Sequence, residues 1–160
     1  MYVDFESLID SSKVWVYQST REFTEKEVEE ISEVLRNFVD TWKRHGKDLK
    51  ASFQIRYNQF VILAVDESYN GISGCSIDAS ANMFKNIEDK YNVDMFNKLN
   101  TAFKYGDHIN IVTLFDFQKY VKEEKINSKT IVFNNMITTK KELENRWELA
   151  AEDSWHSRYF

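Results

Sequence analysis

The chain has 160 residues, a formal net charge of −5 and a single cysteine, and these numbers exclude several classes of protein. Its length predicts one domain, 1–160. The negative charge argues against a nucleic-acid binder that holds phosphates through clustered Lys and Arg. One cysteine cannot form an internal disulfide, and the N-terminus carries acids where a signal peptide carries bases, so we expect a cytoplasmic protein. No apolar run approaches the roughly 20 residues that a membrane-spanning helix needs.

The first part of the chain predicts a strand followed by a well-defined helix. Residues 13–19 are β-branched and aromatic, which favours a strand. Thr24 and Glu27 form a capping box, so a helix is expected to begin after Thr24. Apolar residues then recur at spacings of three and four as far as Trp42. The sequence Arg44-His45-Gly46 is predicted to end this helix.

Two strands and a glycine-containing loop come next. Residues 49–57 alternate between apolar and polar side chains, which indicates a strand with one buried face. The apolar run 60–65 is typical of a central strand that is covered on both faces. A loop at 70–74 then leads into a second helix, expected over about 76–91, whose inward residues are predicted to be Ile77, Phe84, Ile87 and Tyr91.

The rest of the chain alternates short helices and strands, and it contains no repeat or linker. We expect a short helix over 95–100, strands at 101–105 and 109–113, a helix over 114–125 capped by Thr113, a strand at 130–135 and a final helix from Thr139 to about Ala151.

This order predicts a single α+β domain with an antiparallel or mixed sheet and helices mainly on one face. The first part fits a ferredoxin-like arrangement with its first and third strands in the centre.

One hypothesis for function rests on the only cysteine. Cys75 lies where the second helix starts, and unpaired N–H groups at such a position can stabilise a thiolate. His156 or His45 can act as its base and Asp78 can orient a partner, as in Cys–His nucleophilic catalysis. The competing interpretation is a small residue packed behind a turn, since free cysteine is commonly buried.

A second hypothesis is an anion or nucleotide site in the loop that precedes this helix. Backbone N–H groups of Gly71, Ser73, Gly74 and Ser76 can cradle a phosphate. Acidic residues flank the loop on both sides and would repel an anion, and the competing interpretation is a turn that requires glycine. The chain contains no P-loop pattern, which argues against an ATPase.

The C-terminus suggests a third hypothesis, a binding or interaction module without catalysis of its own. Chain ends are usually polar, whereas this one carries Trp155, Arg158, Tyr159 and Phe160. These side chains are expected either to dock onto the body of the protein or to contact a protein or small-molecule partner. One cysteine and three scattered histidines predict no metal site, and no motif predicts a cofactor. We favour this third hypothesis, and the other two stay open.

Six stretches of the chain form a recognisable set: Val14-Trp15-Val16-Tyr17-Gln18, Trp42-x-x-His45-Gly46, Lys50-Ala51-Ser52-Phe53 with Tyr57-Asn58, Ser73-Gly74-Cys75-Ser76-Ile77-Asp78, Thr130-Ile131-Val132-Phe133-Asn134-Asn135 and Ser154-Trp155-His156-Ser157-Arg158. Together they resemble a family of small Bacteroidota proteins, and the resemblance covers nearly the whole chain.

Members of this family often carry the label ABC transporter ATPase. The resemblance implies a bacterial cytoplasmic protein, and the label implies an association with a transporter operon or complex. The resemblance supplies no mechanism. The chain has no P-loop, which contradicts the ATPase activity that the label names.

Overall fold

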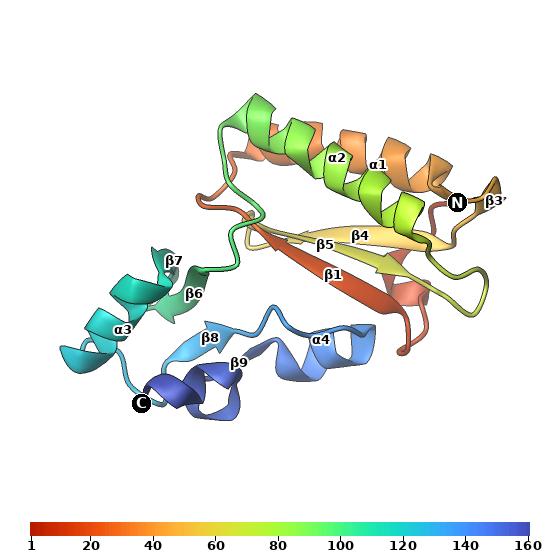
Figure 1. The fold of residues 1–160 in the computed structure, drawn as a ribbon. Coiled ribbons are helices and arrows are strands. Elements are labelled where there is room, and N and C mark those ends of the chain that lie inside the picture. The colour runs from red at the N-terminus through yellow and green to blue at the C-terminus, as the bar shows by residue number, and fades with distance from the viewer. The chain divides into compact units, whose positions relative to one another are not determined.

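Figure 1 shows the computed structural model of the protein, which describes all residues from 1 to 160. It contains four α-helices, and its nine short strands form small antiparallel sheets, so the predicted α+β class is confirmed. No helix combines the length and the apolar character that crossing a bilayer requires.

The contacts divide the chain into two compact units. The first unit contains Met1–Phe96 with Thr138–Lys141, and the second contains Asn97–Ile137 with Glu142–Phe160.

The first unit consists of a three-stranded sheet with two helices on one face (Figure 1). The sheet order is β1-β5-β4, with both pairings antiparallel, so the first and third long strands are neighbours. The elements are η1 (Phe5–Ser7), β1 (Lys13–Gln18), α1 (Glu25–Thr41), β2 (Lys43–Arg44), β3 (Lys47–Asp48), β4 (Ala51–Arg56), β5 (Phe60–Val65) and α2 (Gly74–Tyr91).

A segment from much later in the chain completes this sheet. The Val14 N–H donates a hydrogen bond to the Thr138 carbonyl (2.9 Å), and Lys13 forms an antiparallel bridge with Thr139. If β1, β4, β5 and the returning segment are numbered 1 to 4 in chain order, their order across the sheet is 4-1-3-2. This is the ferredoxin-like arrangement. The prediction for the first part of the chain is therefore confirmed.

Hydrophobic packing between α1, α2 and the sheet holds the first unit together. Leu35 of α1 and Phe84 of α2 are fully buried, and Phe84 stacks on Tyr17 of β1 with ring centroids 3.7 Å apart. Every residue of β5 is buried, as expected of a central strand. Burial of these apolar side chains is the main term that stabilises the unit.

The predicted capping box at the start of α1 is present. The Thr24 hydroxyl accepts a hydrogen bond from the Glu27 N–H (3.2 Å), and the Glu27 carboxylate accepts one from the Thr24 N–H (2.9 Å). The guanidinium of Arg21 also donates two hydrogen bonds of 2.8 Å to Glu27. This Arg21 contact, followed by the Thr24 N–H, lowers the pKa of Glu27 to about 2.

The end of α1 differs from the prediction. The helix stops at Thr41, and β2 and β3 pair as a small hairpin. His45 and Gly46 both have positive φ angles, 48° and 79°, at its turn. Two successive residues in this conformation make a tight hairpin turn rather than a helix end, so the basic residues here do not cap α1.

Phe84 and Ile87 of α2 are buried as predicted, but the first residue of the predicted inward face is not. Ile77 is 41% exposed, whereas Ser76 is buried. The Ser73 hydroxyl caps the helix by accepting from the Ser76 N–H (3.2 Å), so α2 begins at Gly74. The Ser76 hydroxyl then donates to the Lys43 carbonyl (2.8 Å), which holds Ser76 inward and leaves Ile77 in solvent.

The second unit contains a four-stranded antiparallel sheet of order β7-β6-β8-β9. Phe103, Phe117 and Val132 lie in its core. Its elements are β6 (Asn100–Tyr105), β7 (His108–Thr113), α3 (Leu114–Lys122), β8 (Ile131–Phe133), β9 (Glu148–Ala150), η2 (Ala151–Asp153) and η3 (Trp155–Tyr159), together with α4 (Lys140–Arg146), whose first two residues are counted with the first unit.

Two predicted helices in this part of the chain are corrected. No helix forms over 95–100, because the Asp94 and Asn97 side chains accept hydrogen bonds from N–H groups two residues ahead and make turns. The last helix ends at Arg146 and not near Ala151. Residues 148–150 form β9 instead, which pairs with β8. The predicted cap of α3 is confirmed, since the Thr113 hydroxyl accepts from the Asp116 N–H (3.1 Å).

Candidate functional site

Cys75 and its proposed partners in the first unit are all exposed. Cys75 is the second residue of α2 and its thiol faces solvent. His45 lies at the turn of the β2–β3 hairpin, and Asp78 lies one helical turn after Cys75. No hydrogen bond links either side chain to the sulfur. The geometry therefore shows an accessible thiol, and catalysis at Cys75 stays a prediction.

His156, the other proposed base, is packed inside the second unit and is 1% exposed. Its Nδ1 lies 2.8 Å from the Ser154 hydroxyl, and its ring stacks on Trp155 with centroids 3.8 Å apart. Burial, and after it the positive charge of Arg158, lowers the pKa of His156 to about 4. The imidazole is therefore neutral at pH 7 and helps to hold the C-terminus in place.

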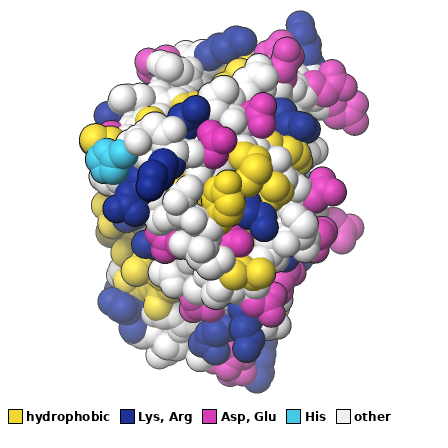
Figure 2. Space-filling model, turned by 90° about the vertical axis from the view of Figure 1, so that its right-hand side faces the viewer, with side chains coloured by type: hydrophobic (Ala, Val, Ile, Leu, Met, Phe, Trp, Pro, Cys, Tyr) yellow, Lys and Arg dark blue, Asp and Glu magenta, His cyan; other side chains and the backbone are white.

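The loop of the anion hypothesis already uses some of its own N–H groups. The Ser76 N–H is bound by Ser73, and the Ile72 N–H donates to the Glu67 carboxylate (3.2 Å). Arg44 supplies a nearby cation, because a side chain placed at Gly71 would come within 3.2 Å of its guanidinium. Figure 2 shows the face turned toward the β3 end of Figure 1, where basic and acidic side chains are mixed. Anion binding at 71–76 stays a prediction.

The C-terminal side chains dock within the second unit. The rings of Tyr159 and Phe160 lie 6.3 and 6.1 Å from the ring of Phe117 in edge contacts. The guanidinium of Arg158 lies 5.9 Å from the rings of both Trp155 and Tyr159. Docking in cis, one of the two predicted alternatives, is therefore observed. Phe160 remains 43% exposed, and a partner contact there stays a prediction.

A pocket in the second unit offers a further candidate site. Its volume is about 210 Å³, and it is formed by the β6–β7 hairpin, α3 and the chain that follows α3. Half of its lining residues are aromatic, and the lining consists of Phe103, Tyr105, Asn110, Tyr120, Lys125 and Ile126.

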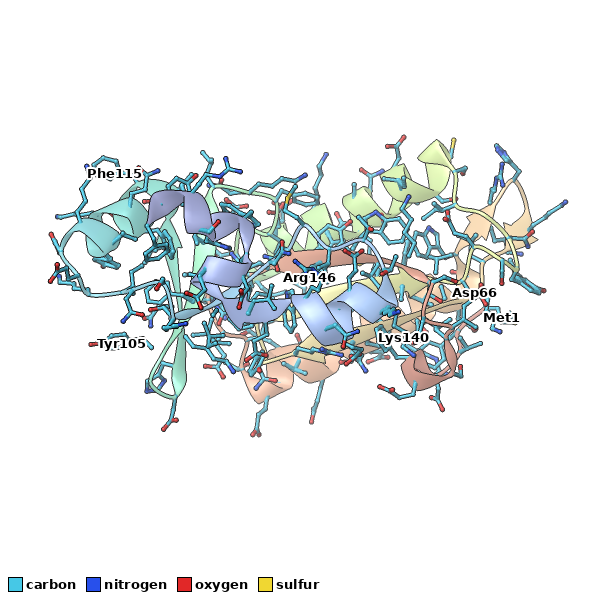
Figure 3. All side chains as sticks on the ribbon, turned by 90° about the horizontal axis from the view of Figure 1, so that it is seen from below. Met1, Asp66, Tyr105, Phe115, Lys140 and Arg146 are labelled. Atoms are coloured by element: carbon cyan, nitrogen blue, oxygen red, sulfur yellow. The ribbon has the colours of Figure 1, made fainter.

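The hairpin register explains why two of these residues share one face. Phe103 of β6 and Asn110 of β7 are directly opposite each other, so their side chains point to the same side of the sheet. Phe103 is 3% exposed and meets the ring of Tyr120 edge to face, with centroids 6.4 Å apart. Tyr105 shares the face of Phe103 two residues along β6 and is 65% exposed (Figure 3). The pocket thus has a buried aromatic floor and an exposed aromatic rim.

The polar groups of the pocket are few. The Lys125 ammonium lies 5.2 Å from the centre of the Tyr120 ring and 3.0 Å from the Glu123 carboxylate. The hydrogen bond that Lys125 donates to the Glu123 carboxylate raises the pKa of Lys125, so the amine is charged at neutral pH. The side-chain amide of Asn110 is partly buried and forms no hydrogen bond within the chain. A mostly apolar lining with a few converging polar groups is typical of a small-molecule site.

The sequence patterns did not predict this pocket. The shared face of Phe103 and Tyr105 follows from strand alternation and was open to prediction. Tyr120 and Lys125 come from a helix and a loop, and no local pattern places them against the hairpin.

The fold and the pocket together describe an α+β protein with a small, partly aromatic pocket. No protein-family model, curated protein or solved structure matches the chain.

Proposed function

We propose that this protein is a binding module without catalysis of its own, and that its ligand occupies the aromatic pocket of the second unit. The observation that carries the proposal is a pocket in which three aromatic side chains and Ile126 lie beside Asn110, a half-buried residue whose side-chain amide has no hydrogen-bond partner within the chain. This amide is not among the buried polar groups without a partner, so it is accessible from the pocket and available to hydrogen-bond to water or to a ligand.

The size of the pocket favours a small ligand or one group of a larger one. Drug-sized ligands usually occupy roughly 300–1,000 Å³, and this pocket offers about 210 Å³. An apolar cavity of about 150 Å³ accepts a benzene molecule. A single ring with one or two substituents therefore fits the space.

A library of one-ring compounds tests this proposal. We expect binding compounds to shift the NMR signals of the lining residues in the intact protein, with affinities in the high micromolar to millimolar range. Tyr120→Ala should weaken these compounds by about two- to tenfold, because a stacked aromatic pair contributes about 0.5–1.5 kcal/mol beyond the area it buries. Phe115→Ala is the matched control, since Phe115 is also on α3 but is 76% exposed and does not line the pocket (Figure 3). If no compound shifts any lining residue, the proposal fails.

The exposed thiol supports thiol chemistry at Cys75 as a second candidate function. Under the binding proposal, iodoacetamide should modify Cys75 at pH 7 about as fast as it modifies free cysteine, and Cys75→Ser should leave ligand binding unchanged. Mass spectrometry of the alkylated protein measures the rate. A rate more than tenfold higher that falls to the free-cysteine rate in His45→Ala would instead favour the enzyme.

A further inference from the structure

We infer that the ligand of the pocket is an aromatic carboxylate with a single ring, whose ring packs among Phe103, Tyr120 and Ile126 while its carboxylate is bound by Lys125. This inference rests on the proposed function and specifies its ligand class.

The apolar part of the lining suits a flat ring. Phe103 and Ile126 are each 3% exposed and provide rigid walls within the unit. Phe103 already meets Tyr120 and Phe117 edge to face, at 6.4 and 6.0 Å, so the aromatic side chains are held in place by one another. A further ring can join this cluster in the same edge-to-face or offset geometry that aromatic pairs prefer.

The polar part of the lining suits an anion, because its groups can all donate hydrogen bonds. Lys125 supplies a positive charge, and the Asn110 amide supplies an N–H donor. The hydroxyls of Tyr105 and Tyr120 form no hydrogen bond within the chain, and both lie close enough to Lys125 to act on its charge. The charge of Lys125, whose ammonium lies 5.2 Å from the centre of the Tyr120 ring, would repel a ligand cation, and a neutral ligand would gain no ion pair from it.

The carboxylate of Glu123 competes for Lys125 but does not block a second anion. The pair is exposed, with side-chain exposures of 60% for Lys125 and 37% for Glu123, and exposed pairs of this kind contribute little. An ammonium group has three donors, so Lys125 can keep Glu123 and also bind a ligand carboxylate.

The experiment compares three probes by NMR titration of the intact protein. Benzoate carries the ring and the charge, benzamide has nearly the same shape without the charge, and cyclohexanecarboxylate has the charge without the aromatic ring. We expect benzoate to bind about two- to fivefold more tightly than either of the others, as an exposed ion pair allows, and its affinity to fall as the salt concentration rises.

Variants of Lys125 assign this preference to one side chain. Lys125→Met should remove the advantage of benzoate over benzamide while leaving the affinity for benzamide unchanged, and Lys125→Arg should retain it. Lys122→Met is the matched control, because Lys122 is an exposed lysine at the end of α3 that does not line the pocket, and it should have no effect.

The possible results separate this inference from the proposed function. Equal affinities for benzoate and benzamide, or a preference for benzoate that survives Lys125→Met, would overturn the inference and leave the binding proposal standing. A pocket that binds other one-ring compounds but not benzoate would do the same. Absence of any shift in the lining residues, with these probes and with the whole library, would overturn both.

Discussion

Replacement of Phe84 by alanine is expected to lower the free energy of unfolding by about 3–5 kcal/mol. Phe84 is fully buried between α2 and the sheet, and its ring stacks on Tyr17 at 3.7 Å. The change removes the buried ring, leaves a cavity and abolishes the aromatic pair. A domain of this size is stable by about 5–15 kcal/mol, so the variant should lose a large part of its stability.

Ile77→Ala is the matched control on the same helix. Ile77 is 41% exposed, so we expect a change of at most about 0.5 kcal/mol. Urea unfolding followed by circular dichroism measures both variants. This comparison also tests the orientation of α2, because the sequence pattern predicted both residues on its inward face. Equal losses for Phe84→Ala and Ile77→Ala would contradict the observed orientation.

Acidification is expected to destabilise the protein through His156. The pKa of His156 is lowered to about 4 in the folded chain, mainly by burial, from an ordinary value of about 6.5. Below pH 6.5 the unfolded chain takes up a proton at this residue and the folded chain does not, so protonation favours unfolding. The contribution of neutral His156 is complete above pH 6.5 and is lost as the pH falls to about 4. Each pKa unit corresponds to about 1.4 kcal/mol, which gives a total loss of up to about 3 kcal/mol.

Variants separate this effect from the titration of carboxylates. His156→Gln should flatten the decline in unfolding free energy between pH 6.5 and 5, whatever it does to stability at neutral pH. His45→Gln and His108→Gln, which replace exposed histidines, should leave the decline as it is. Urea unfolding at half-unit pH steps provides the measurement. If the decline persists unchanged in His156→Gln, another group causes it.

Local features of the chain could be predicted from the sequence because short-range interactions decide them. The cap of α1 by Thr24 and Glu27 depends on residues three positions apart, and the cap of α3 by Thr113 is equally local. The apolar run of β5 indicated its central position, since only a strand covered on both faces favours apolar side chains throughout. The α+β class and the ferredoxin-like order followed from these elements.

Contacts between distant residues account for the errors. Residues 148–150 continue a helical pattern, but pairing with β8 makes them a strand, because hydrogen bonding to a neighbour outweighs a weak local preference. Residues 43–48 form a hairpin instead of a helix end, and Ser76 is held inward by the Lys43 carbonyl from 33 positions away. No window of sequence contains both partners of such a contact.

The candidate sites divide along the same line. The sequence alone indicated Cys75 as a candidate, because a lone cysteine beside glycines at a helix start is recognisable from the residues themselves. The structure shows that its thiol is accessible. The fate of His156 and the aromatic pocket depended on folding, because burial and proximity are properties of the assembled chain. No local sequence pattern marks Phe103, Tyr120 or Lys125 as a residue of a site. They line one pocket because strand pairing and helix packing bring their side chains together.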